Sequence, residues 1–136
     1  MNRLQEIGAE LVKELEVSLP IWVERSTREI YQAWKGEWPL EIADQARLAG
    51  ERCVVEILPV LRELLESDIA SQPTNPMSIL RRASQYPTGL LQLYEVPPVQ
   101  RDDYLETAFP EDIYGLIPTA FSDFGQDCHE LGIAWG

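Results

Sequence analysis

The chain has 136 residues, a net charge of −12, and 45% hydrophobic residues that include four tryptophans. This length is typical of one domain, and this apolar and aromatic content excludes an intrinsically disordered chain. No stretch approaches the roughly 18 consecutive apolar residues that a membrane span requires. The charged N-terminus lacks the apolar core of a signal peptide. The composition therefore predicts one cytoplasmic domain over residues 1–136, without a membrane partner.

The negative charge is unevenly placed along the chain. Residues 95–136 hold nine acidic residues against one basic residue, whereas residues 1–94 hold fourteen against ten. Nucleic acids and anionic lipids attract basic surfaces, so this balance argues against binding to either of them. Acidity of this kind keeps a protein soluble. Two more specific roles for the acidic residues are a face that binds a basic partner and a face that mimics a nucleic acid.

Taken in chain order, the first 34 residues predict two amphipathic helices. Apolar residues recur at helical spacing over residues 4–19. Proline is tolerated at a helix start and not inside a helix, so we expect a break at Pro20 and a second helix over residues 20–34. Lys35 and Gly36 should end that helix, because cations and glycine commonly lie at helix C-termini.

A long helical segment is predicted over residues 39–71, after Trp38. Its first half carries small residues that permit close contact with another helix, namely Ala43, Ala46, Ala49 and Gly50. Its second half carries larger apolar residues at helical spacing. Pro59 lies inside this pattern. Because the apolar stripe continues across Pro59, we expect a kinked helix and not two separate ones.

Beyond this segment, prolines divide the chain into short elements. We expect a helix over residues 77–85 with Asn75 as its N-cap, and an interruption at Pro87. A helix over residues 99–109 and helical turns over residues 110–124 follow. Strand signals are weak, since no long apolar–polar alternation and no Asn-Gly or Asp-Gly turn occurs. The predicted fold class is all-α: a single-domain helical bundle with short proline-capped helices wrapping it in the C-terminal third.

The residues that could carry chemistry are few. His129 is the one histidine, and Cys53 and Cys128 are the two cysteines. Cys128, His129 and Glu130 are consecutive, so on a helix they point in different directions and are poorly placed to hold one metal ion. No nucleophile elbow, P-loop or dinucleotide fingerprint occurs. We therefore expect no catalytic, metal or cofactor site, and two reduced structural cysteines.

The candidate interaction residues are Arg81, Arg82, Tyr86, Tyr104 and Tyr114. The two arginines form the most basic spot of the chain. We expect them to pair with the acidic C-terminal third, and a phosphate or an acidic partner is the alternative. The tyrosines lie near loop signals, and aromatic residues are enriched at interfaces.

Trp34 and Trp38 lie four residues apart on either side of Gly36. We expect them to pack across a helix end and anchor the core. If they were exposed together, they would indicate a partner site instead, because tryptophan is enriched at interface hot spots.

The string NPMSILRRASQYPTGLLQLYEVPPVQRDDYLETAFPEDIYGLIPTAFSDF and the final CHELGIAWG resemble the C-terminal half of a family of small uncharacterised actinobacterial helical proteins. The resemblance covers roughly residues 74–136. It implies a chain that continues past Trp135 and Gly136 into a further helix, and it implies no reaction, cofactor or partner. The apolar run at the end of the chain also suggests a C-terminal truncation.

Three functions remain open. The leading hypothesis is a noncatalytic interaction or regulatory protein whose Tyr- and Phe-rich C-terminal section contacts a protein partner or a second copy of the chain. The second is a small-molecule binder or an enzyme with a site between helices that no motif reveals, because bundle interiors host ligands. The third is an acidic nucleic-acid mimic, which requires carboxylates spaced like phosphates along one exposed face.

Overall fold

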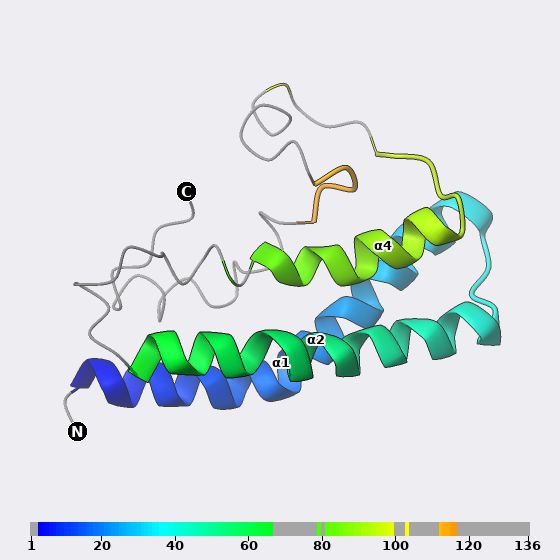
Figure 1. The fold of residues 1–136 in the computed structure, drawn as a ribbon. Coiled ribbons are helices and arrows are strands. Elements are labelled where there is room, and N and C mark those ends of the chain that lie inside the picture. Colours follow the sequence, from blue (N-terminus) through cyan, green and yellow to red (C-terminus); the bar gives the residue numbers. More distant parts are fainter. Residues whose placement is uncertain (1–2, 67–78, 80, 100–102, 104–111, 117–136) are drawn as a thin grey trace.

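The computed structural model describes residues 3–66, 79, 81–99, 103 and 112–116. Its elements are helix α1 (Arg3–Lys35), helix α2 (Leu40–Glu66), the 3-10 turn η2 (Arg82–Ser84) and helix α4 (Gln85–Leu93). Helices α1 and α2 form an antiparallel hairpin, and α4 packs against both (Figure 1). The described part of the chain contains no strand, and the fold is an all-α helical bundle, as predicted.

The predicted break at Pro20 is wrong, because α1 runs through this residue without interruption. Proline costs about 3 kcal/mol in a helix interior, since it has no N–H to donate and its ring crowds the carbonyl four residues earlier. Leu15, Leu19 and Val23 on either side of it are buried. Each buried side chain of this size contributes about 1.5–3 kcal/mol. Packing along α2 therefore outweighs the local cost of the proline.

Helix α1 ends where the sequence predicts. Gly36 has a φ of +72°, in the left-handed region, and its N–H donates to the Gln32 carbonyl at 2.8 Å. This is the usual glycine C-cap. Helix α2 begins at Leu40, and the Ala43 N–H donates to the Pro39 carbonyl at 3.0 Å. The chain therefore reverses over a few residues, which places α2 beside α1.

The small residues of α2 face α1, as predicted. Ala46, Ala49 and Cys53 are buried. At Gly50, a Cβ atom would lie 2.8 Å from the carbonyl oxygen of Pro20 and 2.9 Å from its Cα. Real Cβ atoms do not approach backbone so closely. The two backbones therefore touch at this point, and only glycine fits there.

Helix α2 continues through Pro59, which confirms the prediction of one helix across this proline. The buried core combines the inward faces of α1 and α2 with residues of α4 and of the segments that follow it. Its largest fully buried side chains are Leu11, Leu15, Leu19, Val23, Ile42, Leu61 and Leu91. None of the described helices is both long and apolar enough to cross a membrane.

The predicted interruption at Pro87 is also wrong, because Pro87 is the third residue of α4. The N–H groups of a first helical turn have no acceptor within the helix, so a proline there removes no hydrogen bond. Leu90 and Leu91 follow it and are buried. Of the helix predicted over residues 77–85, the structure describes residues 79 and 81–85.

A short turn at residues 112–116 is held against the segment that follows α4. The Tyr114 hydroxyl donates to the Val96 carbonyl at 2.6 Å, and both residues are buried. Within the turn, the Asp112 carboxylate accepts the Leu116 N–H at 2.7 Å. Apart from this turn and the residues at 99 and 103, the predicted elements beyond residue 98 lie outside the described residues.

Candidate functional site

The structure separates the candidate interaction residues from one another. Tyr86 lies half-buried on α4, and Arg82 lies exposed on η2 with the half-buried Arg81 directly before it. Tyr114 is buried, and its hydroxyl is bound to the backbone, so its side chain serves packing. Tyr104 lies outside the described residues, as does most of the acidic segment that was expected to pair with the arginines.

A groove with a volume of about 400 Å³ runs between α2 and α4 next to Tyr86. Helix α2 contributes charged and amide side chains to it, and α4 contributes mainly an aromatic and apolar wall. The lining residues are Gln45, Arg52 and Glu56 from α2, and Gln85, Tyr86, Gly89, Leu90 and Leu93 from α4. Among the described residues α2 and α4 form its walls, and it is an open groove and not an enclosed cavity.

A second hollow, of about 380 Å³, lies on α2 itself and adjoins the groove. It shares Gln45, Arg52 and Glu56 with the groove and adds Leu48, Glu51 and Val55. Leu48 is 42% exposed, and Val55 is 72% exposed. The two hollows therefore form one continuous surface on which apolar side chains alternate with charged ones.

Four residues of this surface, together with Pro59 beyond it, follow a regular spacing along α2. Gln45, Leu48, Arg52, Val55 and Pro59 recur at intervals of three and four and are exposed. We call these five residues the outer stripe. This spacing places them on one face of the helix. They lie away from the inward-facing residues of α2, such as Ala46 and Cys53, which pack against α1.

Glu56 of α2 and Tyr86 of α4 connect the two walls of the groove. Burial, together with the charge of Glu56 and a hydrogen bond from the Tyr86 hydroxyl to that carboxylate, raises the pKa of Tyr86. The nearby Arg52 guanidinium acts in the opposite direction and lowers the pKa of Tyr86. Tyr86 is therefore neutral at physiological pH and serves as a hydrogen-bond donor.

Cys53 of α2 is free and buried, as expected of a structural cysteine. Burial and the charge of Glu56 raise the pKa of the Cys53 thiol to about 12. Thiolate is the reactive form of cysteine, and almost none is present at neutral pH with such a pKa. Cys53 therefore packs in the core and does not serve as a nucleophile for the groove.

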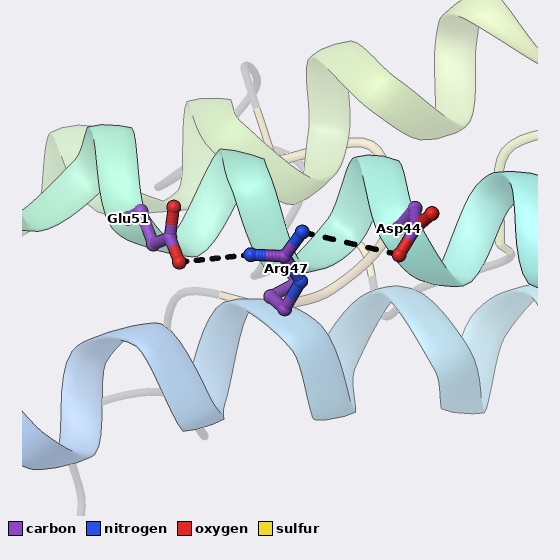
Figure 2. A network of polar contacts seen from close by, with 3 residues as sticks. All are labelled: Asp44, Arg47 and Glu51. Carbon is purple, nitrogen blue, oxygen red and sulfur yellow. Dashed lines mark hydrogen bonds and ion pairs between the residues drawn. The ribbon is translucent and has the colours of Figure 1, made fainter.

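Two arginines of α2 differ in their surroundings. The Arg47 guanidinium lies 3.0 Å from a Glu51 oxygen and 3.9 Å from an Asp44 oxygen, all on the exposed surface of the helix (Figure 2). Exposed pairs of this kind contribute about 0–1 kcal/mol each. Arg52 has no carboxylate within ion-pair distance among the residues that the structure describes.

An aromatic cluster closes the end of the bundle where α1, α2 and α4 meet. The Tyr31 ring makes edge-on contacts with Trp34, Trp38 and Tyr94 at centroid distances of 5.8, 5.9 and 6.3 Å. The Lys35 ammonium lies 4.4 Å above the Trp34 ring. Both tryptophans contact Tyr31 at the helix end. Trp38 packs against the core as predicted, whereas Trp34 is 38% exposed and does not anchor it. Tyr31, which joins them, was not singled out, although its spacing of three before Trp34 is a helical signal.

No protein-family model, no curated protein and no solved structure matches this chain. The resemblance of residues 74–136 to actinobacterial helical proteins therefore remains a prediction. A function for the protein has to be argued from the surface that its own residues form.

Proposed function

We propose that this protein is a noncatalytic interaction protein that binds a helical segment of a partner along the outer stripe of α2, beside α4. The observation that carries this proposal is the exposure of Leu48, Val55 and Leu93 on one grooved surface. Exposed apolar patches with polar rims commonly mark protein-binding sites, because water contact with apolar side chains is unfavourable.

The polar residues of the surface fit the same role. Helix-in-groove recognition uses apolar anchors at intervals of three, four and seven residues, with polar groups that fix the orientation. Leu48 and Val55 are seven residues apart and point outward from one side of α2. Arg52 lies between them and offers hydrogen-bond donors, while Glu56 offers acceptors.

A small molecule is the second candidate, supported by the groove volume of about 400 Å³. Ligand pockets commonly measure about 300–1,000 Å³ and bury most of the ligand surface. A groove with walls from two helices covers a ligand on fewer sides than such a pocket does. Its shape therefore favours a protein segment.

Site-specific photocrosslinking tests the proposal. A photoreactive amino acid is placed at Val55 in the full chain, and a matched variant carries it at Ile21, which is apolar, 57% exposed and located on α1. Irradiation of the cells that express each variant should give a discrete crosslinked product from position 55 and none from position 21. The absence of a product at 55, or equal products at both positions, would refute the proposal. Mass spectrometry of the product identifies the partner.

A further inference from the structure

We propose that the segment bound on the outer stripe is helix α2 of a second copy of this chain, packed antiparallel about a two-fold axis. This inference rests on the proposed function and names its partner.

The spacing of the outer stripe is that of a two-stranded coiled coil. Intervals of three, four, three and four residues separate Gln45, Leu48, Arg52, Val55 and Pro59. These are the a and d positions of a heptad, which form the seam between two helices. In the described fold α1 packs on the inward face of α2 and α4 lies beside the seam, and Leu48 and Val55 stay exposed.

A two-fold interface requires a surface that is complementary to itself. In an antiparallel pair, each a position of one helix meets a d position of the other. One register then places Leu48 opposite Pro59 of the second copy and Arg52 opposite Val55 of the second copy. The two-fold axis repeats both contacts. Each apolar residue of the stripe thus meets an apolar side chain or the aliphatic stem of an arginine.

The charges of the stripe fit the same register. Arg52 and Glu56 both lie on the side of the stripe that faces α4, where they line the groove together. Antiparallel helices bring their equivalent sides together. Arg52 of each copy therefore lies beside Glu56 of the other copy, which gives two equivalent ion pairs. The second copy supplies the carboxylate that Arg52 lacks among the described residues of its own chain.

Sedimentation velocity of the full chain over micromolar to submillimolar concentrations tests this arrangement. The wild-type chain should form a dimer. The single variants Arg52→Glu and Glu56→Arg should each weaken the dimer by about tenfold or more, because each replaces two ion pairs by two repulsions. The double variant Arg52→Glu/Glu56→Arg reverses both charges and should restore the dimer. Ile21→Glu, on α1, should leave it unchanged.

Circular dichroism of each variant shows whether the helices are retained, and rescue by the double variant excludes misfolding as the cause of dissociation. A wild-type chain that stays monomeric over the whole range would overturn the inference, as would a double variant that dissociates like the single ones. Failure of the dimer can be distinguished from failure of the proposed function. If position 55 crosslinks a different protein while the chain is monomeric, that function stands and the dimer does not. A product of two copies of the chain supports both.

Discussion

The substitution Gly50→Ala tests whether direct backbone contact holds α1 and α2 together. The added Cβ would lie 2.8 Å from the Pro20 carbonyl oxygen and 2.9 Å from its Cα. Both atoms belong to the backbone of a helix, so no side chain can rotate away from the new methyl group. The two helices have to move apart, and this loosens neighbouring contacts such as those of Ala49 and Cys53, which are buried.

Two opposing effects determine how much Gly50→Ala changes the free energy of unfolding. Alanine in place of glycine inside a helix stabilises the helix by about 1 kcal/mol. Overpacking a well-filled interior costs about 1–3 kcal/mol, and a collision with rigid backbone lies in the upper part of that range. We therefore expect Gly50→Ala to lower the free energy of unfolding by about 1–2 kcal/mol.

Urea denaturation followed by helical circular dichroism measures this change. Gly89→Ala is the matched control, because Gly89 lies in α4 and a Cβ there would meet no atom within 4 Å. This variant should raise the free energy of unfolding by about 0.5–1 kcal/mol through helix propensity alone. If Gly50→Ala were stabilised as much as Gly89→Ala, the close contact with Pro20 would be disproved.

Three further outcomes are expected. Tyr114→Phe should lower the free energy of unfolding in urea by about 1–2 kcal/mol, because the buried Val96 carbonyl loses its donor; an unchanged midpoint would contradict this. In a Cys128→Ser background, Cys53 should resist thiol reagents until urea unfolds the chain. Its folded pKa of about 12 exceeds the ordinary 9.0, so the stability that it contributes is complete below pH 9.0 and is lost as pH rises toward 12. Pro20→Ala should raise thermal stability by about 1–2 kcal/mol by restoring a helical N–H donor; a lower melting temperature would show that the proline ring is needed.

Local signals in the sequence were sufficient for much of the fold. Gly36 marks the end of α1 because its left-handed conformation depends on the residue itself. The small residues of α2 predict a close contact with another helix, because small side chains let two helix backbones approach each other. The predictions of helix breaks at Pro20 and Pro87 were wrong for two different reasons. At Pro20 tertiary packing overrides the local cost, and at Pro87 the proline falls in a first turn, where it loses no hydrogen bond.

The candidate site was only partly predictable. Tyr86 was singled out from the sequence, whereas Arg52 and Glu56 on the opposite wall of the groove were not. The apolar residues of α2 belong to two faces, and a single periodic pattern does not assign each residue to its face. Tyr114 is buried and donates to the carbonyl of Val96, 18 residues earlier, so no local pattern reveals its position.

The two faces of α2 explain why an outside helix is expected. A surface helix that packs on one side alone carries polar residues on the other side. Helix α2 uses small residues such as Ala46 and Gly50 for its contact with α1, and it still presents Leu48 and Val55 outward. Burying Leu48 and Val55 would gain about 25 cal/mol for each Å² of apolar surface removed from water. In this structure α1 covers the inner face of α2 and α4 lies beside the outer one, so the proposed second helix would cover the apolar side chains that both leave exposed.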